Sequence, residues 1–174
     1  MGQFPEEKIR VLRAEDKEEY ARMRLESLRE SPDSFGSTYE EVLRDKNFDA
    51  QIAKRVQPAD DDFTLGAFED GKLVSMATLE RLSRRKTRHS ADVLSVYTSP
   101  DYRGRGISRA LLSKLIAMVK ERTDIEQLKL KVVTENHGAY QLYRSLGFEV
   151  YGTDKHAFKK GDVYWDQYLM VLFL

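Results

Sequence analysis

The sequence has no cysteine among its 174 residues. This absence excludes disulfide bonds, thiolate metal ligands and a cysteine nucleophile, and it fits a reducing compartment. The three histidines, His89, His137 and His156, lack the close spacing of the paired ligands on a zinc-binding helix. We therefore expect no metal cofactor and no cysteinyl enzyme intermediate.

Long apolar runs and an excess of charge are also missing. The longest apolar run, YLMVLFL at 168–174, is far too short to span a bilayer, and residues 1–19 lack the apolar core of a signal peptide. Lysine plus arginine and aspartate plus glutamate both number 29, so no net field attracts nucleic acid or an anionic membrane. The dense basic run at 81–89 has no stacking aromatics. We expect a cytoplasmic protein that binds neither membrane nor nucleic acid.

The length predicts a single domain over residues 1–174. Asp70-Gly71 is a turn signal inside a β-hairpin, Pro100 ends a strand, and Gly147 ends a helix. The expected strands are 9–13, a hairpin over 63–82, one within 90–100, 126–133, near 148–154 and 163–173. The expected helices are 15–31, two short ones within 37–58, one beginning at 107, and 135–148. This order predicts a mixed α/β sheet with helices packed on it.

The first short helix within 37–58 has a predicted amino-terminal cap. Ser37 stands three residues before Glu40, which is the spacing of a capping box. Pro58 closes a second apolar periodicity that follows. The sequence therefore predicts that the first of these helices begins just after Ser37.

Glycines and arginines precede an apolar helical pattern in YRGRGISRALL at 102–112. The first turn of a helix has unpaired N–H groups and the positive end of the helix dipole, and glycine lets an anion approach the backbone closely. The segment lacks the Gly-Lys-Ser/Thr of a Walker loop and the three spaced glycines of a dinucleotide fingerprint. It predicts an anion site, and a tight strand-to-helix turn with solvated arginines is the alternative.

Two segments together, VYTSPDYRGRGISRALL at 96–112 and NHGAYQLYRSLGF at 136–148, closely resemble the GNAT superfamily of acetyl-CoA-dependent N-acyltransferases. The first is similar to motif A of that family, with its Arg/Gln-x-x-Gly-x-Gly/Ala pattern, and the second to motif B. Ser108 stands where the family usually carries glycine or alanine, and its hydroxyl can donate to a phosphate. The resemblance implies the GNAT fold, a mixed and mostly antiparallel α/β sheet of about seven strands flanked by about four or five helices.

The resemblance also implies acetyl-CoA as co-substrate. The strand before the loop would bulge and splay from its parallel neighbour, and the pantetheine arm would lie in that wedge like an added strand. Main-chain groups of Val96, Tyr97 and Thr98 would contact the arm and the acetyl carbonyl. The pyrophosphate would bind the backbone of Arg103, Gly104, Arg105, Gly106, Ile107 and Ser108.

Three side chains are implicated in the chemistry. By resemblance, Asn136 bonds the cofactor arm, and Tyr143, two helical turns further on, protonates the departing CoA thiolate; a packed core tyrosine is the alternative. An amine with a pKa of about 10.4 must lose a proton before it attacks, and Asp92 is the candidate base. It is expected on the strand face of Leu94 and Val96, with a solvated strand-end carboxylate as the alternative.

The acceptor pocket of the family is usually built by the first helices and the last hairpin. Its candidates here are Arg24, Phe35, Tyr39, Glu40, Glu41, Tyr164, Trp165 and Tyr168. We expect direct acetyl transfer to a primary amine, and an aromatic, acidic pocket favours a small molecule. The alternatives are a protein amino terminus or lysine as acceptor, a CoA-binding sensor without chemistry, and a nucleotide-phosphate binder unrelated to CoA. The family also suggests a homodimer, which no residue demands.

Overall fold

A seven-stranded mixed sheet forms the centre of the computed structural model, which describes residues 2–174. The strands are β1 (Ile9–Val11), β2 (Asp62–Glu69), β3 (Lys72–Arg81), β4 (Ser90–Thr98), β5 (Gln127–Val133), β6 (Glu149–Lys160) and β7 (Val163–Phe173), arranged in the order β1-β2-β3-β4-β5-β7-β6. The helices are α1 (Lys17–Glu30), α2 (Tyr39–Arg44), α3 (Phe48–Arg55), α4 (Ile107–Arg122) and α5 (His137–Ser145). β4 and β5 run parallel, whereas the other neighbouring pairs are antiparallel. The predicted order and type of elements are confirmed.

Turn residues account for several of these boundaries. Asp70 and Gly71 connect β2 to β3 with φ angles of 49° and 78°, as a two-residue hairpin turn requires. Pro100 begins a short 3-10 turn after β4, because its ring fixes φ and removes the N–H that a strand needs. Gly147 has a φ of 97° just after α5. Each signal was readable from the sequence because it acts through local backbone geometry.

The capping box of α2 lies one residue later than predicted. Thr38 Oγ1 accepts the Glu41 N–H at 3.2 Å, and Glu41 Oε2 accepts the Thr38 N–H at 2.8 Å. The prediction of Ser37 and Glu40 is therefore wrong. Thr38 is the last residue with an extended backbone before the helix, and only a side chain at that position can turn onto the first helical N–H groups.

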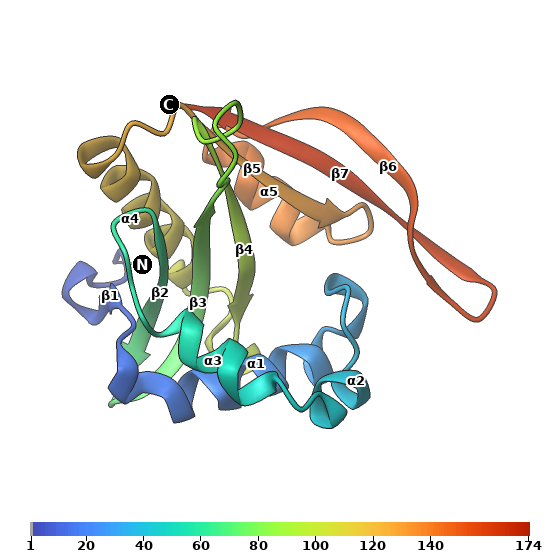
Figure 1. The fold of residues 1–174 in the computed structure, drawn as a ribbon, viewed down its shortest axis with the longest axis horizontal. Coiled ribbons are helices and arrows are strands. Elements are labelled where there is room, and N and C mark those ends of the chain that lie inside the picture. Colours follow the sequence, from blue (N-terminus) through green and yellow to red (C-terminus); the bar gives the residue numbers. More distant parts are fainter. Residues whose placement is uncertain (1) are drawn as a thin grey trace.

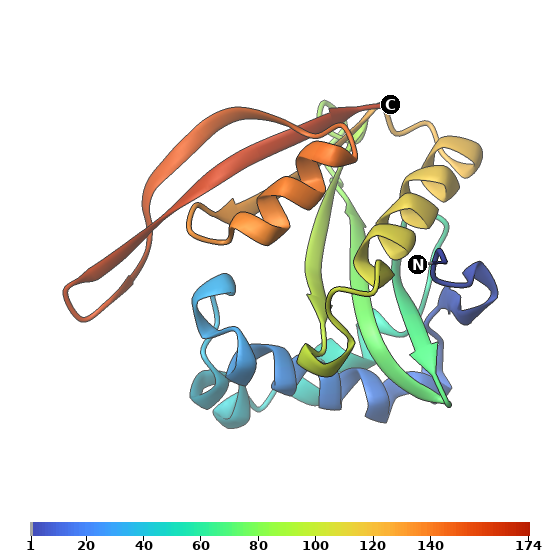
Figure 2. The ribbon, with the colours of Figure 1, turned by 180° about the vertical axis from the view of Figure 1, so that it is seen from behind.

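Helices cover both faces of the sheet, with α4 and α5 on one face and α1 and α3 on the other (Figure 2). On the first face, Leu111 of α4 is buried in a cluster with Leu79 and Val93 of the sheet. On the second, Met23 of α1 is buried against Met76. Within residues 2–174, no helix has the length and apolar character needed to cross a membrane.

β4 and β5 separate after a short parallel ladder. Only residues 90–92 of β4 pair with β5, opposite 127–129, and the two strands diverge beyond that point (Figure 1). Ser95 has a φ of 52°, and Ser95 and Val96 together occupy the space opposite Ala77 of β3. This β-bulge bends β4 away from its parallel neighbour. The predicted bulge and splay are therefore present, and they leave the β5 side of β4 open.

The β6–β7 hairpin extends beyond the body of the sheet (Figure 1). β6 continues to Lys160, past the expected end at 154, and shifts register twice against β7. Phe158 on this extension approaches the loop that follows α1, where a Cβ on Gly36 would lie 3.4 Å from its ring. The loop and the hairpin thus meet across the open side of β4.

Candidate active site

A cleft of about 950 Å³ occupies the separation between β4 and β5. One end is lined by the turn before α4 and by α5, through Arg103, Gly104, Ser108, Asn136, Gly138, Ala139, Leu142 and Tyr143. The middle is lined by both strands, at residues 92–98 and 129–133. Ser31 also lies beside the turn, where its Oγ accepts from Arg103 Nη2 at 3.4 Å. The other end is lined by Arg24, Ser34, Phe35, Gly36, Ser37, Arg55, Tyr151 and Phe158. One continuous space therefore joins the predicted anion loop to the first helices.

The turn before α4 leaves its backbone donors unused. Gly104 and Gly106 both have a φ of 73°, and a Cβ on either would meet nothing within 4 Å. Within residues 2–174, the N–H groups of residues 104–109 have no hydrogen-bond partner, and the first backbone bond of the helix runs from Ala110 N–H to Gly106 O. Open donors at a helix start, approached over glycine, form an anion site. The residues therefore fit a pyrophosphate.

The two arginines of this turn are held in different ways. Arg103 Nε donates to Thr98 O at 2.9 Å, and its guanidinium lies 5.6 Å from the Tyr97 ring centroid. Arg105 donates to Asp101 O at 2.8 Å and lies over Tyr102. Arg103 lines the cleft, whereas Arg105, Gly106 and Ile107 do not. Arg103 is therefore the better placed of the two to contact a bound anion.

The exposed edge of β4 presents alternate residues to the cleft. Ser99 N–H donates to Val74 O of β3 at 3.0 Å. Because successive residues turn their amides to opposite sides, Val96 and Thr98 face the gap, while the Tyr97 main chain faces β3. Thr98 O already accepts from Arg103, which leaves the Val96 groups for an extended ligand. The expectation of a main-chain contact from Tyr97 is thus corrected.

Three side-chain hydroxyls link β3, the end of β4 and the start of α4. Ser75 Oγ and Thr98 Oγ1 lie 2.7 Å apart, and Thr98 Oγ1 and Ser108 Oγ are also 2.7 Å apart. Ser108, the departure from the family pattern, is therefore bonded into the scaffold. Its hydroxyl holds the first turn of α4 against the end of β4.

Asn136 and Tyr143 lie on the α5 side of the cleft. Asn136 is the N-cap of α5, and its Oδ1 accepts the Ala139 N–H at 3.2 Å, so its Nδ2 carries the donors that a ligand could use. The Tyr143 side chain is 6% exposed and packs edge-on to Phe148. Burial raises the pKa of the Tyr143 hydroxyl above its ordinary value of 10.0, so it stays protonated at neutral pH.

Asp92 lies where β4 leaves β5. Burial raises the pKa of its carboxyl, the charge of Glu80 raises it further, and Lys129 and Lys131 act in the opposite direction. The nearby Tyr151 hydroxyl also has a raised pKa, from burial and from the charge of Asp92. Asp92 is thus a half-buried carboxylate in the cleft with a weakened preference for ionisation, as a general base requires.

The predicted strand face of Asp92 needs one correction. Cross-strand partners share a face, and Asp92, Leu94 and Tyr97 pair with alternate residues of β3. The bulge places Val96 against the α4 side, whereas Tyr97 packs on the α1 side. Simple alternation failed here because the bulge inserts an extra residue.

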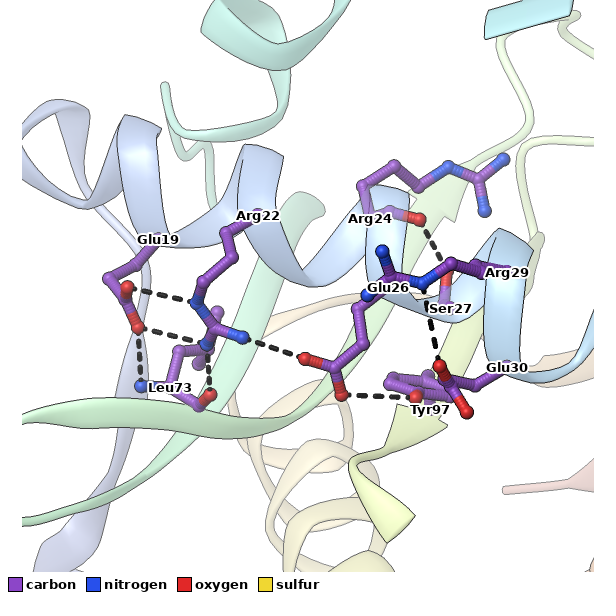
Figure 3. Close-up of polar contacts among 9 residues, drawn as sticks. All are labelled: Glu19, Arg22, Arg24, Glu26, Ser27, Arg29, Glu30, Leu73 and Tyr97. Carbon is purple, nitrogen blue, oxygen red and sulfur yellow. Dashed lines mark hydrogen bonds and ion pairs between the residues drawn. The ribbon is translucent and has the colours of Figure 1, made fainter. Parts of the chain in front are cut away.

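Polar contacts hold α1 against the strands that border the cleft (Figure 3). Arg22 binds Glu19 and Glu26 and donates to Leu73 O at 2.7 Å. Glu26 Oε1 accepts the Tyr97 hydroxyl at 3.1 Å. Because Tyr97 follows the bulge, this network ties the position of α1 to the shape of the wedge.

The acceptor candidates are only partly brought together. Arg24 and Phe35 line the cleft. Glu41 lines an adjacent cavity of about 270 Å³. The remaining candidates, Tyr39, Glu40, Tyr164, Trp165 and Tyr168, line neither of these two cavities. The last three lie on β7, where Tyr164 stacks on His156 and the Tyr168 ring is tilted against that of Tyr140 on α5.

Other residues at this end were missed by sequence reasoning. The structure adds Arg55 from the end of α3, Lys129 and Lys131 from β5, and Tyr151 and Phe158 from β6. Alternation in LKLKVV places both lysines on one strand face, which was a usable signal. Nothing local marks Arg55 or Phe158, because only the tertiary fold brings α3 and the hairpin to this site.

Comparison with known proteins gives the family. The sequence profile of the Acetyltransferase (GNAT) family matches residues 23–148. The chain is 30% identical over 102 residues to L-amino acid N-acetyltransferase AaaT of Escherichia coli (strain K12). The aligned segment covers 58% of this chain and 62% of that protein. It is 34% identical over 95 residues to N-alpha-acetyltransferase RimI of Mycobacterium tuberculosis, covering 55% and 57%. These matches span less than two thirds of either relative.

Solved structures share the fold over nearly the whole chain. A GNAT acetyltransferase from Streptococcus pneumoniae aligns with a TM-score of 0.84 at 24% identity, over 95% of this chain and 98% of that one. The yncA protein from Salmonella typhimurium, solved with its cofactor acetyl-CoA, aligns with a TM-score of 0.77 at 20% identity, over 95% and 92%. The predicted fold and enzyme class are confirmed. With the family profile matched over most of its length, this chain belongs to the GNAT family of acetyltransferases.

Proposed function

We propose that this acetyltransferase moves an acetyl group from acetyl-CoA directly to the primary amine of a small molecule. The observation that carries the proposal is the continuous cleft, with an anion-binding turn at one end and a polar pocket beside α1 at the other. Two reactants can occupy such a space together, so the acetyl group needs no resting place on the enzyme. The absence of cysteine agrees with direct transfer.

The cofactor end fits the parts of acetyl-CoA. The open N–H groups of residues 104–109 would hold the pyrophosphate, and Arg103 would add charge beside it. Val96 on β4 and the Nδ2 of Asn136 would bond the amides of the pantetheine arm. When bound, acetyl-CoA supplies an activated thioester whose leaving group is a thiolate.

Asp92 would take up the proton of the amine, directly or through a water molecule. A protonated amine has no lone pair for attack, so this step must precede or accompany bond formation. The raised pKa of Asp92 brings its basicity closer to that of the amine than an ordinary carboxylate allows. Asp92 lines the cleft at the point where the β4–β5 ladder ends, which supports this role.

Tyr143 would donate a proton to the departing sulfur. Burial keeps its hydroxyl protonated, and the side chain lines the cleft from α5. A hydroxyl that can protonate or hydrogen-bond a developing thiolate stabilises it most strongly where water is excluded. In this proposal Asp92 is the base for the amine, and Tyr143 is the acid for the thiolate.

Two rival functions remain distinct outcomes of experiment. One is acetylation of a protein amino terminus, and the RimI relative is named an N-alpha-acetyltransferase. A CoA-binding sensor would keep the anion turn and need neither Asp92 nor Tyr143. Titration with acetyl-CoA, ATP and NAD also separates a CoA site from a general nucleotide site.

The test is a screen for acetyl-CoA-dependent thiol release over a panel of small amines and of peptides with free amino termini. The proposal expects turnover with a small amine and weaker turnover with every peptide. Turnover with peptides alone would show that the acceptor is a peptide amino terminus and not a small amine. Tight binding of acetyl-CoA without any turnover would indicate a sensor. Tight binding of ATP with none of acetyl-CoA would contradict the cofactor assignment.

A further inference from the structure

We infer that Arg24 binds a carboxylate of the acceptor, so that the substrate is an amino acid or a close analogue with a free acid group. The inference rests on the proposed function and adds the substrate class. Arg24 lies on α1 and lines both the main cleft and the smaller cavity beside it. Both spaces therefore open onto the same guanidinium.

One guanidinium nitrogen of the partly buried Arg24 side chain has no partner. Its Nη1 is inaccessible to solvent and donates no hydrogen bond, and no carboxylate within residues 2–174 lies within ion-pair distance of the side chain. Arg22, two residues earlier, has two carboxylates and a carbonyl, and Arg24 points away from that network (Figure 3). A buried cation is unfavourable unless it is paired. The missing partner fits a bound anion.

Neighbouring acidic groups do not supply that partner. Glu41 and Asp45 line the smaller cavity, but Glu41 accepts the Thr38 N–H, and Asp45 accepts the Asn47 N–H and a Gln51 amide N–H. These carboxylates cap the ends of α2 and the start of α3. Their hydrogen bonds hold them within their own turns, away from Arg24.

A second arginine strengthens the field at this site. Arg55 lines the same two cavities as Arg24, and its charge lowers the pKa of Arg24 in addition to the larger effect of burial. Arg55 is itself paired with Glu80 at 2.7 Å. Of the two cations, Arg24 is thus the one left to bind a ligand, and an anion there would also relieve the repulsion from Arg55.

The surroundings fix the guanidinium in place. Arg24 lies 5.2 Å from the Phe35 ring centroid, an arrangement in which the aromatic face supports a flat cation. The loop that carries Phe35 meets Phe158 of the hairpin, where a Cβ on Gly36 would lie 3.4 Å from the ring. A planar, held guanidinium suits a carboxylate, which it can bind through two parallel hydrogen bonds.

The cleft therefore has two polar groups that an acceptor could use. Asp92 is the proposed base for the amine, and Arg24 is the proposed partner of an acid group in the same cleft. A free amino acid carries both groups, whereas an amino acid within a peptide amino terminus carries an amide in place of the acid. Two such groups in one cleft favour the small zwitterion.

The experiment compares matched acceptors and an Arg24→Gln variant. For several side chains, kcat/KM is measured for the L-amino acid, its carboxamide and the amine without the acid group. The wild type is expected to prefer the acid, and Arg24→Gln to lower kcat/KM for the acid by about 10- to 100-fold while changing the amide by less than about threefold. Arg24→Lys should retain part of the preference. Arg29→Gln, an exposed position on the same helix, is the matched control and should change nothing.

Thermal stability separates a binding role from a structural one. Removal of an unpaired buried charge should leave the melting temperature unchanged or raise it, whereas Arg22→Gln should lower it through loss of three contacts. Equal use of acid and amide by the wild type, or an unchanged preference in Arg24→Gln, would overturn the inference. If no amine is acetylated, the proposed function fails, and calorimetry decides the carboxylate site separately. Amino acid binding in the presence of CoA that Arg24→Gln lacks would support it, and no binding to the wild type would overturn it.

Discussion

Glu80 and Asp92 lie directly opposite each other on the antiparallel strands β3 and β4. Arg55 neutralises Glu80 across a distance of 2.7 Å, while Asp92 faces the cleft. Burial and the neighbouring Glu80 charge together raise the pKa of Asp92. The cross-strand pair therefore tunes the one carboxylate proposed to receive the proton of the amine.

Replacement of Glu80 should shift the pH dependence of the reaction. In Glu80→Gln the like charge is gone and Arg55 loses a partner, and both changes favour ionised Asp92. The acidic limb of the kcat/KM profile should move to lower pH. Glu69→Gln is a matched control, because Glu69 pairs with Lys8 and does not line the cleft. An unmoved acidic limb in Glu80→Gln would remove Asp92 as the base.

Asp92→Asn should lower activity and raise stability at neutral pH. A carboxyl whose pKa is raised on folding destabilises the fold above that pKa, and the penalty disappears as the pH falls toward the ordinary value of 3.8. The melting temperature at pH 7 should rise by about 1–2 °C, a small shift because the group is half exposed. The difference from wild type should shrink on acidification. A fall in both activity and melting temperature would indicate a structural role instead.

Tyr143→Phe should slow the chemical step and leave cofactor binding intact. The ring packs against Phe148 in either case, whereas the proton donor to the thiolate is lost. We expect kcat to fall about 100-fold or more, with the acetyl-CoA affinity measured by calorimetry within about twofold. Tyr140→Phe, on the same helix but outside the cleft lining, should retain full activity. Equal turnover by Tyr143→Phe and wild type would show that the hydroxyl is only a packing group.

Gly106→Ala should weaken acetyl-CoA binding beyond its effect on stability. Gly106 and Gly71 have φ angles of 73° and 78°, and a Cβ at either position meets nothing within 4 Å. Alanine at both sites should therefore destabilise the fold by a similar amount, about 1 kcal/mol. Only Gly106 belongs to the turn whose N–H groups are proposed to bind the pyrophosphate, so only there should the methyl affect binding. Equal acetyl-CoA affinities of the two variants would place the pyrophosphate elsewhere.

Local chemistry made the cofactor end predictable from the sequence. The glycines at 104 and 106 adopt the positive φ that their pattern suggested, and Asn136 caps the helix that it begins. The wedge itself followed from family resemblance, but its origin at Ser95 did not. A serine with a positive φ in a strand carries no sequence signal, since the conformation is imposed by the packing of β4 against β3 and α1.

The acceptor end was predicted poorly because it is assembled from distant segments. Aromatic residues such as Tyr164 and Trp165 were attractive by type, but neither lines the cleft, whereas Phe158, opposite Trp165 on the β6–β7 hairpin, does (Figure 1). No local sequence pattern identifies Arg55 or Phe158 as part of the site. Arg24 was anticipated by type, whereas its lack of a partner became visible only when every neighbouring carboxylate could be placed.

The central claim is direct transfer between two reactants held in one cleft. Initial rates measured with acetyl-CoA and the best amine varied together, with the N-acetyl product quantified by mass spectrometry, test it most directly. Direct transfer predicts intersecting double-reciprocal lines and one acetylated amine for each CoA thiol released. Parallel lines, which report an acetylated enzyme, or thiol release that does not depend on the amine, would contradict it.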